Sequence, residues 1–199
     1  LPRLRNLTEQ HGALLIFDEI VTGFRLRRAG AQEYFGTTPD LAVFAKGMSN
    51  GAPLSCYLGR AEIMDGVKAA NISSTVGVGT RGLSAAKAVL EVDDSADVIG
   101  TLWSRGEQLH QGFNSHSQRL GIPACFRGLP PMGQLVLDPD DPQRDAELYL
   151  RFNAEVLKRG LIIYSIFYPT FSHTVQDIET AVEAMGEALD AMYNQGLFD

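Results

Sequence analysis

Three charged residues follow two apolar runs of the sequence and could do chemistry together. Asp18 and Glu19 come directly after the run ALLIF, and Lys46 comes directly after the run LAVFA, 28 residues beyond Asp18 (46 minus 18). If these runs are neighbouring strands, an acid and an amine at their ends can reach opposite ends of one small ring. An amine at the end of a buried strand is expected to be partly removed from water, which favours its neutral, nucleophilic form.

The acid pair also has a second interpretation. An apolar strand followed by Asp-Glu is the arrangement with which a P-loop nucleotide triphosphatase holds magnesium, and Asp18 would then be the metal ligand. That chemistry requires a G-x-x-x-x-G-K-[ST] loop for the phosphates, which the sequence does not contain. The glycine-rich run GVGTRG, residues 77–82, lacks the lysine and the hydroxyl that follows it. The magnesium alternative stays open with less support.

The apolar runs that must position these residues show no alternation. Residues 13–17 and 41–45 are continuously apolar, which is typical of strands that helices cover on both faces of a parallel sheet. A third strand is expected at 53–59, after the turn residues of GMSNGA. The alanine-rich residues 83–92 predict a helix.

The second half of the sequence predicts a smaller α+β region. Asp141 and Pro142 predict the N-cap and first residue of a helix. Thr174, with Asp177 three residues later, predicts a variant of the capping box at the start of the last helix. The run LIIYSIF between these helices predicts a strand.

Composition excludes several kinds of partner. The chain has 199 residues, a net charge of −7 and a pI near 5.1, which argue against binding to nucleic acid. No run reaches the roughly 18 apolar residues of a membrane span, so no membrane partner is expected. Cys56 and Cys125 have no disulfide-framework or zinc-site spacing, so we expect no metal and a reducing, cytoplasmic location.

Three stretches together resemble the class III pyridoxal-phosphate aminotransferases, in particular the branch around glutamate-1-semialdehyde aminomutase. They are LLIFDEIVTGFR, AQEYFGTTPDLAVFAKGMSNGAPLSCYLGRAEIMD and RGLIIYSIFYPTFSHTVQDIETAVEAMGEAL. The resemblance implies an α/β fold of the type I PLP-dependent transferases. Residues 1–100 would form the C-terminal part of the large, parallel-sheet PLP-binding domain, and residues 101–199 the small C-terminal α+β domain. The implied enzyme is an aminotransferase or aminomutase that transfers an amino group through Schiff-base intermediates between small amino donors and acceptors.

The resemblance also assigns roles to four residues around pyridoxal 5'-phosphate. Asp18 would pair with the pyridine nitrogen, and Ile20 would pack on one face of the ring. Lys46 would bind the cofactor as a Schiff base and carry protons as the catalytic residue. Thr75 would bind the cofactor phosphate across a dimer interface, although the segment VGVG that follows it departs from the family pattern. His173 is expected to pack and cap rather than to catalyse.

The resemblance begins in the middle of the family's chain, and this sequence opens with LPRLRN and no methionine. The phosphate-binding glycine/serine loop and the second ring-stacking side chain of the family are therefore outside it. We expect the chain to act in a homo-oligomer or with a complementary N-terminal half chain. The alternative is a catalytically silent fragment that acts as a structural or interaction module.

Overall fold

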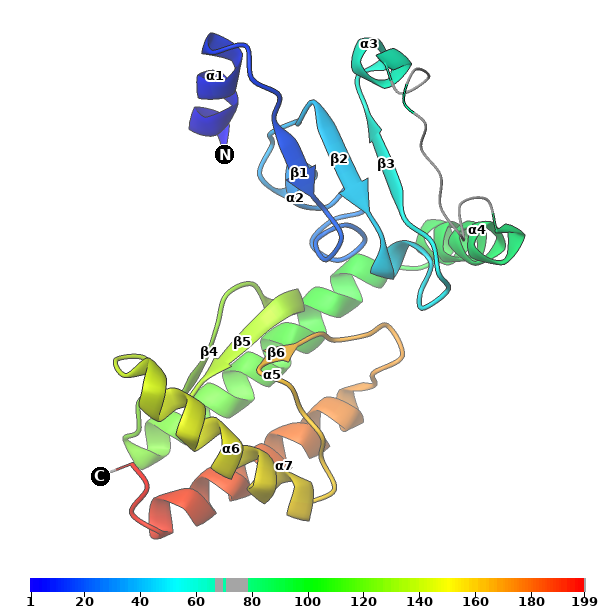
Figure 1. Cartoon of the computed structure of the whole chain (residues 1–199). Coiled ribbons are helices and arrows are strands. Elements are labelled where there is room, and N and C mark those ends of the chain that lie inside the picture. Colours follow the sequence, from blue (N-terminus) through cyan, green and yellow to red (C-terminus); the bar gives the residue numbers. More distant parts are fainter. Residues whose placement is uncertain (67–69, 71–78, 199) are drawn as a thin grey trace. The chain divides into compact units, whose positions relative to one another are not determined.

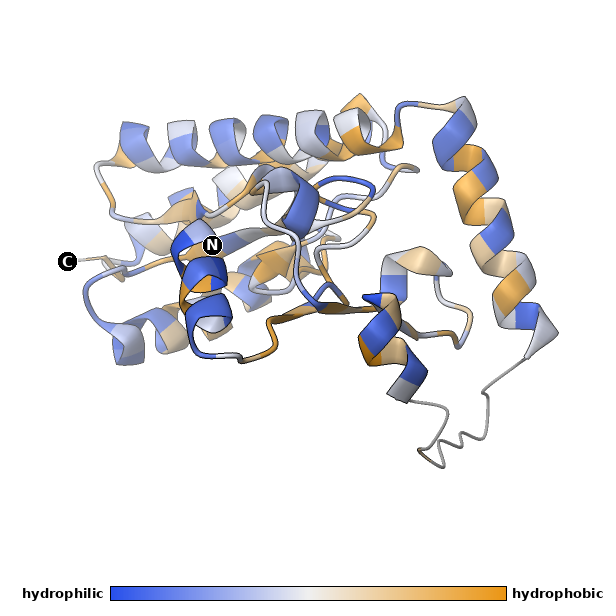
Figure 2. Ribbon diagram, turned by 90° about the horizontal axis from the view of Figure 1, so that it is seen from above, coloured by the Kyte–Doolittle hydropathy of each residue, from blue (hydrophilic) through white to orange (hydrophobic). Residues whose placement is uncertain are grey.

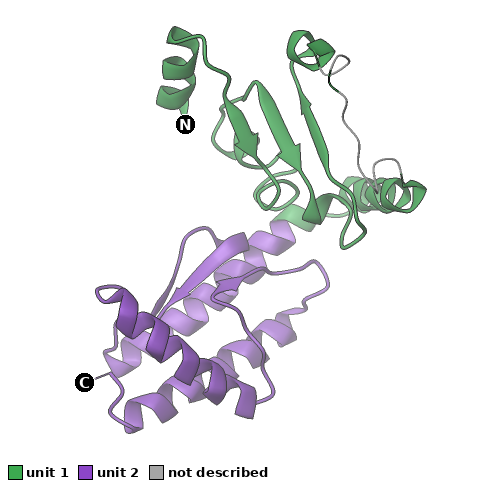
Figure 3. Cartoon of the chain, viewed as in Figure 1, with its two compact units in different colours: residues 1–99 green, residues 100–199 purple. Residues whose placement is uncertain are grey.

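The computed structural model of the chain describes residues 1–66, 70 and 79–198 (Figure 1). The chain forms two compact units, residues 1–99 and 100–199 (Figure 3). The elements of unit 1, in chain order, are α1 (Pro2–Gln10), β1 (Ile16–Asp18), α2 (Ala31–Tyr34), β2 (Leu41–Phe44), the 3-10 turn η1 (Lys46–Met48), β3 (Cys56–Gly59), α3 (Ala61–Met64) and α4 (Thr80–Ser95).

The three strands of unit 1 form a mixed sheet in the order β1-β2-β3. β1 and β2 are parallel, and Asp18 lies opposite Val43. β2 and β3 are antiparallel, and Val43 lies opposite Tyr57. The parallel pairing of the first two strands agrees with the sequence prediction, but the prediction of a parallel sheet is wrong for the third. β3 runs antiparallel because the connection from β2 to β3 contains no crossover α-helix.

Only one face of this sheet is buried by the described residues. Its core consists of Leu15, Phe17, Ala42, Phe44 and Met48. Side chains alternate between the faces of a strand, and Ile16, on the opposite face from Phe17, is 57% exposed. The prediction that residues 13–17 are covered on both faces is therefore wrong for the described part of the chain.

The helices of unit 1 leave further apolar surface exposed. α1 ends at Gln10, and Gly12, two residues later, has a left-handed φ of 62°, which is common for a glycine after a helix. α4, the helix that follows the grey trace in Figure 2, carries both apolar and polar residues along its length. Its Leu83, Leu90 and Val92 are 53%, 38% and 45% exposed. Unit 1 thus shows apolar side chains on both its sheet and α4.

Unit 2 is a three-stranded antiparallel sheet with long helices. Its elements are α5 (Val98–Leu120, which begins at the end of unit 1), β4 (Cys125–Arg127), the 3-10 turn η3 (Pro130–Met132), β5 (Gly133–Val136), α6 (Pro142–Lys158), β6 (Ile166–Phe167) and α7 (Val175–Asn194), and its strand order is β4-β5-β6.

The predicted starts of the last two helices of unit 2 are confirmed. The Asp141 side chain accepts hydrogen bonds from the first-turn N–H groups of α6. Thr174 and Asp177 form a reciprocal capping box at the start of α7. In contrast, only two residues of the run LIIYSIF pair as a strand, β6, which is shorter than predicted.

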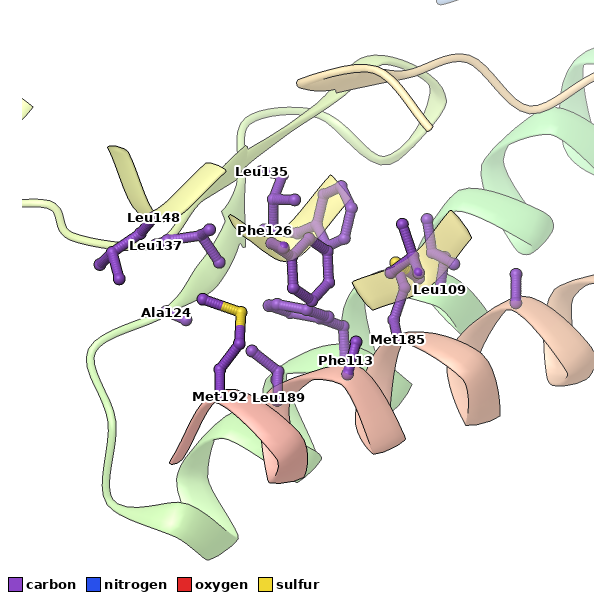
Figure 4. Close-up of a cluster of buried hydrophobic side chains, with 14 of the residues drawn as sticks. Leu109, Phe113, Ala124, Phe126, Leu135, Leu137, Leu148, Met185, Leu189 and Met192 are labelled. Carbon is purple, nitrogen blue, oxygen red and sulfur yellow. The ribbon is translucent and has the colours of Figure 1, made fainter. Parts of the chain in front are cut away.

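The core of unit 2 is built around Phe113, a fully buried residue of α5 (Figure 4). Its ring meets Phe126 of β4 edge to face, with centroids 5.2 Å apart, and Phe152 of α6, with centroids 5.9 Å apart. Such aromatic pairs contribute about 0.5–1.5 kcal/mol beyond their buried area. Met185, Leu189 and Met192 complete this core from α7. Unit 2 therefore has a hydrophobic core of its own.

No helix in the described part of the chain is long and apolar enough to cross a bilayer. The same residues bring together no group of three or more His, Cys, Asp or Glu that could hold a metal ion. Cys56 and Cys125 are both free thiols.

Candidate functional site

Asp18 ends one strand and Lys46 follows the carboxyl end of the neighbouring parallel strand. Asp18 is the last residue of β1 and pairs with Val43 of β2. From Val43 the chain passes through Phe44, where β2 ends, and reaches Lys46 after one further residue. In α/β proteins, ligands bind outside the carboxyl ends of such strands. The acid and the amine therefore belong to the edge of the sheet where a ligand is expected.

Lys46 has a left-handed backbone conformation, with φ of 45°. It opens η1, and its carbonyl oxygen accepts hydrogen bonds from the backbone N–H groups of Ser49 at 3.2 Å and Asn50 at 3.0 Å. This conformation costs a non-glycine residue about 1–2 kcal/mol. Strained residues persist only where their surroundings hold them, and they cluster at functional sites.

The side chain of Lys46 is exposed, and Nζ makes no hydrogen bond or ion pair with the described residues. The prediction that burial partly removes this amine from water is therefore wrong for the described chain. The physical reason is that the lysine lies beyond the end of β2, whose sheet is covered on one face only.

Asp18 is also exposed, but its carboxylate is anchored at one oxygen. Oδ1 accepts a hydrogen bond from the backbone N–H of Ile20 at 3.0 Å. Oδ2 has no hydrogen-bond partner among residues 1–66 and 79–198. It can therefore accept a hydrogen bond from a protonated nitrogen of a ligand. Ile20 itself is half-buried directly after the strand.

Glu19, beside Asp18, is completely buried. Its carboxylate accepts hydrogen bonds from the backbone N–H groups of Ala31 and Gln32, both at 2.8 Å, and from the hydroxyl of Thr22. The first two donors are the N-terminal residues of α2. Glu19 therefore holds part of the connection between β1 and β2 from inside the protein, which is a structural role.

Two further candidates lie outside the described residues of unit 1. Thr75 lies outside the described residues, and its phosphate contact stays a prediction. His173 belongs to unit 2. Its Nδ1 accepts a hydrogen bond from the backbone N–H of Thr170 at 3.1 Å, and its ring stacks on Phe167. The carbonyl oxygen of His173 accepts a hydrogen bond from Nε of Arg105 at 3.1 Å. These contacts fit the packing role expected for His173.

Sequence reasoning missed the residues of the β1–β2 connection that contact Phe44 and Gly47, on either side of Lys46 in the chain. Phe24 has a left-handed φ of 58°, and its ring meets Phe44 edge to face, with centroids 6.2 Å apart. A Cβ on Gly23 would lie 2.4 Å from the ring of Phe44. The motif TGF contains a glycine and an aromatic residue, but nothing in the sequence indicates that they pack beside Lys46.

Comparison with known proteins relates the whole chain to a family. The family described as Aminotransferase class-III matches residues 1–189. The glutamate-1-semialdehyde 2,1-aminomutase of Syntrophobacter fumaroxidans is 33% identical over 94% of this chain and 47% of its own length. The 3-aminobutyryl-CoA aminotransferase of Cloacimonas acidaminovorans is 31% identical over 95% of this chain and 46% of its own length.

Solved structures agree with the sequence comparison. The FumI protein of Sphingopyxis sp. MTA144, solved in its PLP internal aldimine form, superposes with a TM-score of 0.88 at 27% identity, over 96% of this chain and 46% of that one. The α/β fold thus matches class III transaminase structures over about half their length, and the chain spans about half the length of the curated relatives it matches. A match that covers 189 residues of the sequence shows that this chain belongs to the class III aminotransferase family.

Proposed function

We propose that this chain supplies the lysine and the aspartate of a pyridoxal-phosphate site for amino-group transfer. The observation that carries the proposal is that Asp18 ends β1 while Lys46 follows the carboxyl end of the parallel strand β2. Family membership supports it over the magnesium alternative. The reaction class is that of an aminotransferase or aminomutase acting on small amines.

The side chains of this chain fit the cofactor. Oδ2 of Asp18 would hold the proton on the pyridine nitrogen, while Oδ1 stays anchored on the N–H of Ile20. Nζ of Lys46 would bind the cofactor and then move a proton to and from the substrate carbon. Ile20 would pack on the ring, and Thr75 would donate to the phosphate. When bound, pyridoxal phosphate supplies the electron sink for this chemistry.

The proposed site requires further protein, from a complementary N-terminal half chain or from a homo-oligomer. The chain spans only 47% of the aminomutase it resembles. In the described part, β1 is an edge strand, and Leu14 and Ile16 beside this edge are 53% and 57% exposed. An edge strand flanked by apolar side chains is a template for pairing with another strand. A cytoplasmic location fits this function and stays a prediction.

The test is covalent labelling of the four lysines, Lys46, Lys68, Lys87 and Lys158. The purified chain is incubated with pyridoxal phosphate, reduced with borohydride and mapped by peptide mass spectrometry. The same labelling is repeated after addition of the N-terminal half of the Syntrophobacter fumaroxidans aminomutase. We expect preferential labelling of Lys46, stronger in the second sample, and its loss in a Lys46→Arg variant.

Equal labelling of Lys46 and the exposed Lys87 and Lys158 in both samples would overturn the proposal. That result would favour the alternative, a catalytically silent module. The exposed amine of Lys46 is the observation that keeps this alternative in view.

A further inference from the structure

The buried carboxylate of Glu19 holds the first part of the connection between β1 and β2. It accepts hydrogen bonds from the hydroxyl of Thr22, near the start of the connection, and from the backbone N–H groups of Ala31 and Gln32, which open α2 midway along it. Gly30 makes room for it, since a Cβ there would lie 2.2 Å from Glu19 Oε2. Thr22 to Gln32 are thereby gathered around one side chain.

No Lys, Arg or His of the described residues forms an ion pair with Glu19, although the side chain is 0% exposed. Burying a carboxylate without a cation is unfavourable unless hydrogen bonds replace its water. α2, which it caps, has only four residues. Three hydrogen bonds replace that water, and all three donors belong to residues 22–32, so the Glu19 carboxylate is committed to holding this segment.

The other side of the connection packs on the chain around Lys46. The backbone N–H of Gly23 donates to the carbonyl oxygen of Glu19 at 2.9 Å, which fixes Gly23 close to the ring of Phe44. A Cβ on Gly47 would lie 3.5 Å from both the Gly23 oxygen and Phe24 Cβ. The connection therefore touches the residue two before Lys46 and the residue one after it.

Two left-handed residues, Phe24 and Lys46, are thus held in one packed unit. Each would relax toward ordinary backbone angles if its neighbours moved, because strained conformations persist only where the surroundings over-determine them. Glu19 acts on both through the segment 20–30. The contacts of the connection with Phe44 and Gly47 therefore limit the path of the chain through Lys46.

We infer that Glu19 is a positioning residue for Lys46, acting through Gly23, Phe24 and Phe44. Glu19 fixes the connection, and the connection fixes the backbone of Lys46. The amine is thereby held at the edge of the sheet where β1 ends in Asp18. This inference rests on the proposed function for the role of Lys46, but the positioning itself is a property of the chain without cofactor.

The test compares Glu19→Gln with a matched control, Asp40→Asn. Gln keeps the size of Glu19 but replaces one acceptor with an N–H donor, so at least one bond to the connection is lost. Asp40 is likewise a buried carboxylate of unit 1, 2% exposed, that accepts a backbone N–H. It directly precedes β2, at the opposite end of the strand from Lys46. Both variants remove a buried carboxylate. Only Glu19→Gln alters the contacts through Gly23, Phe24 and Phe44 that are proposed to position Lys46.

Two measurements are made on each variant at a temperature where it remains folded. The first is hydrogen exchange at the amides of Ser49 and Asn50, which bond the Lys46 carbonyl and report its backbone without cofactor. The second is the rate of borohydride-trapped pyridoxal-phosphate labelling on Lys46, relative to Lys87. Because displacement of a reacting group by about 1 Å can cost about a hundredfold in rate, we expect Glu19→Gln to slow labelling by about tenfold or more. It should also speed exchange at both amides, while Asp40→Asn, which only lowers the stability of unit 1, should change both readouts less.

A second variant, Gly23→Ala, reaches the same element without altering a charge, because its Cβ would press on the ring of Phe44. It should reproduce the effects of Glu19→Gln. The inference is overturned if Glu19→Gln leaves both readouts unchanged, or if Asp40→Asn changes them equally. Absence of preferential Lys46 labelling in the wild-type chain would instead contradict the proposed function, and the exchange data would then decide the positioning role alone.

Discussion

Asp40 accepts a hydrogen bond from the backbone N–H of Leu15 at 2.8 Å, so one carboxylate ties the start of β2 to the chain that enters β1. The same group binds Arg5 at 2.9 Å and Arg60 at 3.0 Å, and its side chain is 3% exposed. It stabilises the end of the sheet away from Lys46. This relationship makes the fold of unit 1 sensitive to acid.

The first prediction concerns pH. The bond from Leu15, followed by those from Arg5 and Arg60, lowers the pKa of Asp40 to about 2. The folded chain therefore binds this proton less readily than the unfolded chain, whose aspartates titrate near pH 3.9. The stabilisation is present above about pH 4 and is lost as pH falls toward about 2. Asp40→Asn should lower the free energy of unfolding at pH 7, and its difference from wild type should shrink over that range.

Urea unfolding at a series of pH values checks this prediction. Asp190→Asn, which removes an exposed partner of Arg119, is the control and should change stability by about 0–1 kcal/mol at most. A deficit of Asp40→Asn that stays constant from neutral pH to about pH 2 would contradict the assignment.

The second prediction concerns cofactor affinity. Asp18→Asn keeps an oxygen for the N–H of Ile20 but removes the charge that would face the pyridine nitrogen. A hydrogen bond to a charged group contributes about 1.5–3 kcal/mol, so pyridoxal phosphate should bind about tenfold to a hundredfold more weakly. Absorbance titration, in the sample that labels on Lys46, measures the change. Asp140→Asn in unit 2 is the control, and equal affinities of the two variants would count against a role for Asp18.

The third prediction uses a glycine inside a helix. Gly106 lies in α5, where alanine normally stabilises a helix by about 0.5–1 kcal/mol. Here a Cβ would lie 2.0 Å from the carbonyl oxygen of Pro130. Gly106→Ala should therefore destabilise unit 2, by about 1–3 kcal/mol, reversing the usual sign. Thermal unfolding checks this prediction, with Ser104→Ala at an exposed residue of the same helix as the control. A raised Tm for Gly106→Ala would refute the close contact.

The fourth prediction concerns the partner. Ile16→Ser should change the stability of the chain by less than about 0.5 kcal/mol, since the side chain is 57% exposed. The variant should weaken association with the N-terminal half of the Syntrophobacter fumaroxidans aminomutase, measured by calorimetry. Leu150→Ser, at a residue of unit 2 that is 70% exposed, is the control. Unchanged association of Ile16→Ser would show that this face of β1 is not the surface that the partner covers.

Local signals in the sequence predict the elements whose cause is local. The cap of α6 by Asp141 and the capping box of Thr174 and Asp177 depend on residues within one helical turn, and both form as predicted. The positions of Asp18 and Lys46 at strand ends also follow from the apolar runs before them. The resemblance to the class III family then suggests which reaction this acid and amine would support, the amino-group transfer proposed above.

The features that the sequence does not predict depend on residues far along the chain. Continuous apolar character cannot distinguish a strand covered on both faces from one whose second face the described chain leaves open, as at Ile16. The antiparallel direction of β3 depends on the path of its connection. The contact of Gly23 with Phe44 joins residues whose proximity is set by Glu19, and neither composition nor spacing reveals it.

The position of β1 at the rim of its sheet bears on how the chain behaves during synthesis. Its outer backbone N–H and C=O groups pair with no strand of the described chain, and apolar side chains flank them. Such a rim is prone to aggregation through non-native strand pairing between copies. We therefore expect the chain to precipitate when it is overproduced alone, and co-expression with a polypeptide that covers β1 to raise the yield in the cleared lysate.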